Sequence, residues 1–273
     1  MKIILSRKGF DSTYGGIPSP ILPDGTLLSM PIPSLDDTLS FEDLQYGGHT
    51  YREILQQLAT ERRYKSKFRD ARCHLDPDIR EGVRIKPESN WKPAFGQIDQ
   101  AQSYLSNRGV GKDDLFLFFG RFQKTIGDIA EGTLEFNKKE PIIHIIYGYM
   151  QIGDVVSGKA TADLNFKWHP HGSGERANED SNTLYLPADK LSFGKGRCGW
   201  GTFKFAESRV LTLSKKTATW KRIDCLLPEW VDKDVKNNAE DKDKGIYYQG
   251  QWQELVLKED SPIDDWIKEI FKT

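Results

Sequence analysis

The sequence predicts a single α+β domain over residues 1–273, with a curved, partly barrel-like β-sheet and a few peripheral helices. Three observations favour this class. Strand-like runs follow one another closely from residue 114 onward, only three segments have helical spacing, and strands do not alternate regularly with helices. No clean linker divides the chain, so we expect one domain, although the length alone would also allow two.

The N-terminal part begins with a predicted buried strand over residues 2–5. A loop rich in glycine, proline and serine follows, and residues 27–32 offer a second short strand. Loops that follow strands often carry substrate-binding groups. Ser6, Arg7 and Lys8 are therefore candidates for binding a phosphate. Their spacing matches no P-loop or dinucleotide motif, and an ordinary solvated loop is an equally good interpretation.

Three helices are predicted. Thr50 begins the first, with Glu53 three residues later as in a capping box, and residues 61–63 form its solvated end. Residues 97–105 form the second helix. Ser261-Pro262 opens the last helix, with serine as the cap and proline in the first turn. Apolar residues at helical spacing give this last helix a core-facing stripe, namely Ile263, Trp266, Ile267, Ile270 and Phe271.

The middle of the chain is rich in predicted strands. Residues 114–122 form a dense aromatic strand, residues 142–156 form another, and residues 123–140 form a long hairpin loop between them. Residues 232–244 are charged and poor in apolar side chains, which is typical of a surface loop. Five shorter strands are predicted over residues 183–186, 201–205, 210–213, 219–225 and 246–257.

Composition limits the classes of function. Lysine plus arginine number 39 against 40 aspartate plus glutamate, a formal net charge of −1, so any binding of nucleic acid is expected to be local. Cys73, Cys198 and Cys225 are widely spaced, which indicates reduced thiols rather than disulfides or a zinc ribbon. The sequence shows no membrane-spanning apolar run and no signal-peptide core, so we expect a cytoplasmic protein without membrane contact.

Two short segments contain three of the five histidines: His74-Leu75-Asp76-Pro77-Asp78 and His169-Pro170-His171. In an extended chain residues i and i+2 leave the same face, and the residue before a proline avoids the helical region. His74 with Asp76, and His169 with His171, are therefore predicted to be paired metal ligands. Imidazole with carboxylate is the ligand set of a divalent transition metal.

Three interpretations of these segments stay open. In the first, the four side chains share one metal. In the second, they form a metal-free polar active site, and in the third the two segments are turns that only stabilise the fold. In a metal-free site, Asp11 with Arg7 and a histidine would perform acid–base chemistry. Cys198 lies between glycines with Lys195 and Arg197 nearby, a setting that would activate a thiol, although single cysteines are usually inert.

Segments along most of the chain resemble the third of the nucleotide-modification-associated domain families, found in bacteria and phages. Their order follows that of the family, and the opening segment is the most specific. The segments are Leu5–Ser12 with Gly15-Gly16 and Pro18-Ser19-Pro20, Pro23-Asp24-Gly25, His74–Asp78, Phe95-Gly96-Gln97, Asp114–Gly120, His169–His171, Asn182–Tyr185 and Gly250–Val256. The resemblance implies an association with nucleotides or modified bases and supplies no reaction.

A second resemblance concerns the predicted sheet alone. A turn and apolar strand over residues 111–119, followed by residues 147–156, resemble the PUA-like barrel, whose members bind modified or flipped bases. By that resemblance, a base would stack against the rings of Trp168 and Trp200, although aromatic residues in strands are more often part of the core.

Two functions are therefore considered. The first is a metal-dependent enzyme that modifies nucleotides or bases, with His74, Asp76 and the His169/His171 pair as ligands of Fe(II) or, less favoured, Zn(II), as in non-haem oxygenases. In it Asp78 would hold a ligand imidazole, and Arg80, Asn182 and Trp168 would contact substrate. The second is a non-catalytic PUA-like module that binds modified bases in DNA or RNA.

Overall fold

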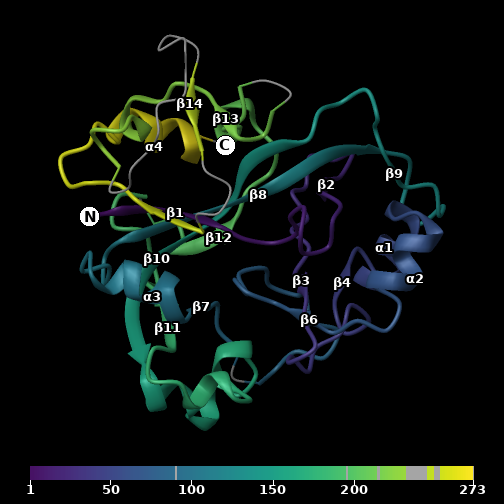
Figure 1. Cartoon of the computed structure of the whole chain (residues 1–273), viewed down its shortest axis with the longest axis horizontal. Helices are drawn as coiled ribbons and strands as arrows, with labels where there is room; N and C mark the ends of the chain where they lie inside the picture. The colour runs from purple at the N-terminus through teal and green to yellow at the C-terminus, as the bar shows by residue number, and fades with distance from the viewer. Residues whose placement is uncertain (90, 195, 214–215, 232–244, 249–252, 273) are drawn as a thin grey trace.

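A curled, mixed sheet forms the centre of the computed structural model, which describes the chain except residues 90, 195, 214–215, 232–244, 249–252 and 273 (Figure 1). Within the described part of the chain the sheet has nine strands. They are β1 (Ile3–Arg7), β2 (Ser19–Ile21), β7 (Phe95–Gln97), β8 (Leu115–Ile126), β9 (Glu135–Phe136), β10 (Ile143–Ser157), β11 (Thr183–Pro187), β12 (Trp200–Thr202) and β15 (Glu254–Val256).

The strand order explains how distant segments meet. The main path runs β15-β1-β8-β10-β11-β7, with β2 and β9 beside β8 and β12 beside β10. β1 pairs with β8 in parallel and with β15 antiparallel, whereas β10 is antiparallel to both β8 and β11. The sheet curls into a half-barrel with the helices at its periphery, which confirms the predicted α+β class.

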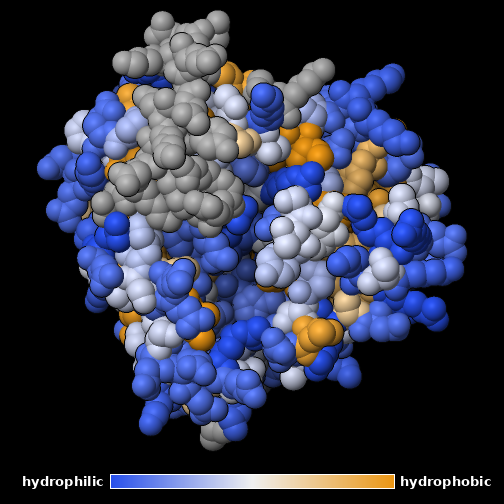
Figure 2. Space-filling view, in the orientation of Figure 1, coloured by the Kyte–Doolittle hydropathy of each residue, from blue (hydrophilic) through white to orange (hydrophobic). Residues whose placement is uncertain are grey.

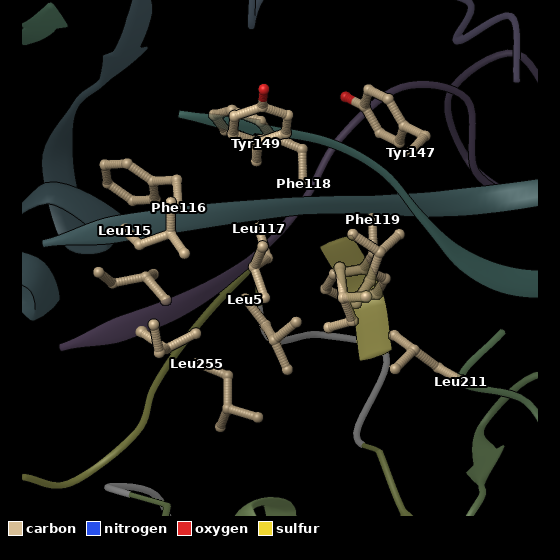
Figure 3. Close-up of a cluster of buried hydrophobic side chains, with 14 of the residues drawn as sticks. Leu5, Leu115, Phe116, Leu117, Phe118, Phe119, Tyr147, Tyr149, Leu211 and Leu255 are labelled. Atoms are coloured by element: carbon tan, nitrogen blue, oxygen red, sulfur yellow. The ribbon is translucent and has the colours of Figure 1, made fainter. Parts of the chain in front are cut away.

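Strand β8 is buried on both faces, which explains its nearly continuous apolar sequence. Figure 3 shows Phe116 and Phe118 on one side of the strand and Leu117 and Phe119 on the other, as the two-residue period of a strand requires. On the first side Phe95 lies 4.8 Å from Phe116 between ring centroids. Because both faces are covered, this strand is recognisable from sequence as an unbroken apolar run.

The first predicted helix is confirmed together with its cap. α1 (Tyr51–Leu58) begins after Thr50, whose side chain accepts from the Glu53 backbone N–H while the Glu53 carboxylate accepts from the Thr50 N–H. The residues expected to end it instead form a separate helix, α2 (Glu61–Lys67), capped by Thr60. Ala59 has an extended backbone and ends α1. Thr60 then caps the start of a separate helix.

The other two helices begin later than predicted. Residues 95–97 belong to β7, and α3 (Asp99–Ser106) starts beyond them. α4 (Asp264–Phe271) starts after Ile263, which makes no side-chain cap, so Ser261 is not its cap. The predicted core-facing stripe of α4 is confirmed, since Ile267 and Ile270 are buried and its other members pack against the same core.

Apart from β11, which extends one residue beyond the predicted 183–186, the late strands are shorter than predicted. Residues 27–31 and 210–213 make only isolated bridges, and in the C-terminal part β13 (Thr219–Trp220) and β14 (Ile246–Tyr247) form a two-stranded ribbon. β8 extends to Ile126, so the predicted loop over 123–140 begins later and contains β9. The surface loop predicted over residues 232–244 lies outside the described residues.

A second hydrophobic cluster gathers residues from the N-terminal third of the chain, including Phe10, Phe41 and Phe68, whose rings contact one another. α1 and α2 lie on this side, at the right in Figure 1. Two small ribbons belong here as well: β3 (Ile32–Pro33) with β6 (Cys73–His74), and β4 (Gln45–Tyr46) with β5 (His49–Thr50). The ribbon β3-β6 carries His74 toward the central sheet.

Candidate metal site and its cavity

Three of the predicted ligands come together in space. The ligand atoms of His74, Asp76 and His171 lie within 4.8 Å of one another. His74 is in β6, paired with Ile32 of β3, and Asp76 follows two residues later. His171 is in the 3₁₀ helix η3 (Pro170–Gly172), about a hundred residues along the chain. Among the described residues this is the one group of three His, Cys, Asp or Glu side chains with such spacing.

The imidazole of His74 is held with one nitrogen turned to a carboxylate. Its Nδ1 lies 3.1 Å from Asp37 Oδ2, and Asp37 Oδ1 accepts from Arg176 Nη1 at 2.9 Å. Because the carboxylate can only accept, Nδ1 carries the proton in the neutral ring, and Nε2 then keeps its lone pair. A carboxylate behind a histidine is the arrangement that orients metal-binding imidazoles.

His171 is oriented by a buried amide. Its Nδ1 lies 2.7 Å from Asn182 Oδ1, while Asn182 Nδ2 donates to Thr161 Oγ1 and to the His171 carbonyl, both at 2.7 Å. A carbonyl can only accept, so the amide cannot be turned round, and Oδ1 must receive the Nδ1 proton. In their neutral forms, both imidazoles of the site therefore have an unprotonated Nε2.

Asp76 completes the group. Its Oδ1 accepts from the Gly96 backbone N–H at 2.7 Å, and His169 Nε2 lies 3.4 Å from the same oxygen. His169 Nδ1 accepts from the His171 backbone N–H, so in the neutral ring the proton is on Nε2, facing Asp76. The structure thus places His169 behind Asp76 rather than in the group of ligands.

Gly96 allows the close packing of this site. A Cβ atom at this position would lie 2.2 Å from the ring of His171 and 2.8 Å from its Cβ. The same residue donates to Asp76, so this single position in strand β7 adjoins two of the three candidate ligands. A glycine inside a strand often marks such a close approach.

Burial and charge keep the ligands in the protonation states that a metal needs. Burial lowers the pKa of His171 to about 3, so its ring is neutral at physiological pH. For Asp76, burial alone would raise the pKa, but the adjacent His169 ring and the charges of Lys8 and the histidines outweigh it and hold the pKa below its usual range. Asp37 behaves similarly: burial opposes the lowering, yet its hydrogen bond with His74 brings its pKa to about 2.

The donor set fits a divalent transition metal. It consists of two imidazole nitrogens with free lone pairs and one ionised carboxylate, the combination of the two-histidine, one-carboxylate sites. The candidate donor atoms lie within 4.8 Å of one another, close enough to belong to one site.

The three side chains line a cavity of about 870 Å³, large enough for a nucleotide-sized ligand. Figure 2 shows it as a hollow near the centre of the face, lined mainly by hydrophilic residues. Its walls come from α3 and β7 on one side and from β3 and β6 on the other (Figure 1). The cavity therefore separates the central sheet from the N-terminal hydrophobic cluster.

The N-terminal loop contributes part of the wall. Arg7, Lys8 and Asp11 all line the cavity. Arg7 and Asp11 form a loose ion pair, with Nη2 3.9 Å from Oδ2, and Asp11 Oδ1 also accepts from the backbone of Tyr14. Ser6, predicted to bind substrate, is completely buried and donates to Glu254, so it supports the wall from behind.

Other predicted site residues lie elsewhere. Asp78 is buried against Arg84, whose Nε and Nη2 donate to its Oδ2 at 3.0 and 2.9 Å, and it contacts none of the imidazoles. Arg80 donates to the Leu27 carbonyl. Trp168 is buried with its Nε1 donating to the Asn165 carbonyl, and Asn182 supports His171 from the side away from the cavity lining. Trp200 and the exposed Cys198 do not line the cavity either.

Asn182→Ala removes the acceptor that fixes the Nδ1 proton of His171. We expect the affinity for zinc(II) to fall about 10- to 100-fold, the usual effect of losing such a supporting hydrogen bond. Competition with a chromogenic chelator measures this affinity. Asn178→Ala is the matched control, since Asn178 is exposed and its Nδ2 makes only a long contact with Gly174. An unchanged affinity in Asn182→Ala would mean that His171 is not a ligand.

An α+β fold that holds two histidines and a carboxylate in the wall of a nucleotide-sized cavity defines a ligand-binding protein with a candidate metal centre. The chain belongs to the family described as nucleotide modification associated domain 3, whose model matches residues 2–260. This confirms the family resemblance and supports a role in nucleotide modification, whereas the PUA-like resemblance is not confirmed. Comparisons with curated proteins and with solved structures found no match.

A search of the described residues found no helix that is both long and apolar enough to span a membrane.

Proposed function

We propose that the chain is a metal-dependent enzyme that modifies nucleotides or nucleic-acid bases, with His74, Asp76 and His171 as the ligands of an iron(II) ion, or secondarily zinc(II). One observation carries the proposal: in both imidazoles an acceptor engages Nδ1 and leaves Nε2 free beside an ionised carboxylate. Metal-binding histidines almost always donate their second ring N–H to an acceptor of this kind.

Each residue has a defined part in this proposal. Three protein ligands leave coordination positions open toward the cavity, where iron(II) would supply oxidative chemistry with dioxygen and zinc(II) would supply an activated water. His169 packs behind Asp76, with its Nε2 3.4 Å from Asp76 Oδ1. Arg7 and Asp11 line the cavity as a charged pair and are the groups available to bind a phosphate or to move a proton.

Metal analysis of the purified protein tests the proposal. Near-stoichiometric iron or zinc is expected in the wild type after exposure to either ion, and its loss is expected in His74→Ala and in His171→Ala. His49→Ala is the control, since His49 is in the β4-β5 ribbon and does not line the cavity. A wild type that takes up neither ion, with folded structure intact, would refute the ligand assignment.

The second candidate is a module that binds bases without catalysis. It is supported by the size of the cavity, which needs no metal to hold a base. The tryptophans expected to stack a base, Trp168 and Trp200, do not line this cavity, which makes the candidate weaker. A metal-free protein that still binds nucleotides would favour it.

A further inference from the structure

Glu254 is a buried carboxylate in the wall of the cavity, with only one of its oxygens supplied with donors. It is 2 % exposed. Its Oε1 accepts from Ser6 Oγ at 3.0 Å and from Gln97 Nε2 at 2.7 Å, and Lys8 Nζ lies 3.3 Å away. Its Oε2 is equally shielded from solvent and has no hydrogen-bond partner among the residues that the structure describes.

Burying a carboxylate oxygen without a hydrogen-bond donor costs free energy, because the oxygen loses its hydrogen bonds to water and gains none in return. The chain nevertheless brings Ser6 and Gln97, from two different strands, to fix this carboxylate in one position. Such a fixed acceptor at a cavity wall is suited to receive an N–H group of a ligand. A ligand that supplies an N–H donor removes this free-energy cost, so Glu254 favours ligands that carry such a donor.

The neighbouring Lys8 defines the rest of the recognised pattern. Lys8 and Glu254 line the same cavity, so a donor and an acceptor stand side by side. Every nucleobase carries an N–H donor next to a ring nitrogen or carbonyl acceptor on its hydrogen-bonding edge. A phosphate has acceptors alone, and the carboxylate would repel it.

The exposure of the charged side chains in the cavity indicates which end of a ligand would be buried. Side-chain exposure rises from 1 % for Glu254 and 11 % for Lys8 to 21 % for Arg7 and 26 % for Arg176. All four line the cavity, so the Glu254 end is the buried one and the two arginines are nearer to solvent. Arginine suits the oxygens of a phosphate through its planar set of donors.

We propose that Glu254 Oε2 and Lys8 Nζ bind the hydrogen-bonding edge of a nucleobase at the buried end of the cavity, while the sugar and phosphate point toward Arg7 and Arg176. This deepens the proposed function and rests on it only for the choice of a nucleotide as ligand, since base binding needs no metal. The base comes either from a free nucleotide or from a single strand.

Calorimetric titration of the full chain in the presence of a chelator tests this proposal without any metal. The ligands are the four nucleoside monophosphates, a single-stranded oligonucleotide containing all four bases, ribose 5-phosphate and inorganic phosphate. At least one base-containing ligand should bind tenfold or more tightly than ribose 5-phosphate. Binding by monophosphates identifies a free nucleotide as the source, and binding by the oligonucleotide alone identifies a strand.

Glu254→Gln should weaken that binding about 10- to 100-fold, because one charge-assisted hydrogen bond is lost, and should leave the affinity for ribose 5-phosphate unchanged. Glu259→Gln is the control; Glu259 is exposed, pairs with Lys2 and does not line the cavity. Thermal unfolding verifies that each variant is folded.

Three results would overturn the proposal: binding of ribose 5-phosphate as tight as that of every base-containing ligand, unchanged base binding in folded Glu254→Gln, or no binding of any base-containing ligand. The first and third need only the wild type, so they remain decisive if Glu254→Gln fails to fold. Base binding without metal uptake would contradict the metal site alone, and metal uptake without base binding would contradict this inference alone.

Discussion

Gly96→Ala should remove metal binding and destabilise the protein. The added methyl group would lie 2.2 Å from the His171 ring, and the buried ring cannot turn away while Asn182 and the Gly96 side of β7 enclose it. Overpacking of this kind costs about 1–3 kcal/mol in the free energy of unfolding. The displaced imidazole should also lower the affinity for zinc(II) by about 100-fold or more, since one of three ligands moves.

Chemical denaturation and chelator competition measure these two effects. Gly111→Ala is the matched control, because the same added methyl group meets no atom within 4 Å and the residue has an ordinary backbone conformation. Equal stability and metal affinity in the two variants would mean that His171 does not depend on the close approach of Gly96.

Arg84→Met should be the most destabilising single change, by about 3–5 kcal/mol, because it leaves the buried carboxylate of Asp78 without its cation. Arg84 donates twice to Asp78 Oδ2 and once to the Trp168 carbonyl at 3.2 Å. Among the residues that the structure describes, Trp91 Nε1, at 3.0 Å, would be the donor left to that oxygen. Burial already raises the pKa of Asp78, and the loss of the guanidinium would raise it further.

The double variant Arg84→Met with Asp78→Leu separates a structural from a catalytic role of Asp78. Removing both charges should recover most of the lost stability, since a buried ion pair replaced by apolar groups is often close to neutral. The double variant should also keep its metal, because neither residue belongs to the ligand group. Loss of metal from a stable, folded double variant would show that Asp78 does act on the site.

Local sequence alone was sufficient for the elements whose signals are local. The two long strands β8 and β10 follow from long, mostly apolar runs, and the start of α1 follows from the Thr50–Glu53 capping box. The residues of the candidate metal site were also visible, as histidines and an aspartate in two short segments that contain proline. His74, Asp76 and His171 were all among the predicted ligands.

The sequence could not decide between His169 and His171. The prediction assumed an extended chain, in which both rings leave the same face, but Pro170–Gly172 forms a 3₁₀ turn. The two rings therefore diverge: His171 faces the cavity, and His169 is buried behind Asp76. A single added turn hydrogen bond, from Gly172 N–H to the His169 carbonyl, is enough to change the direction of a side chain.

Several supporting residues were absent from the predicted site. Gly96 and Glu254 appeared only within segments that resemble the family, and Asp37 was not among the predicted site residues. Nothing local marks them, because their roles depend on contacts with residues 20 to 248 positions away in the chain, such as Gly96 with Asp76 and Glu254 with Ser6.

The sequence by itself determined the class of fold, the main strands and the types of side chain available for chemistry. The tertiary structure alone decided which of them meet: β1 lies between β8 and β15, which brings Lys8 beside Glu254, and the packing of η3 on Gly96 brings His171 to Asp76. The physical reason is that periodicity and caps act within a few residues, whereas a site depends on the pairing of segments whose order in the sheet is fixed by the burial of the whole core.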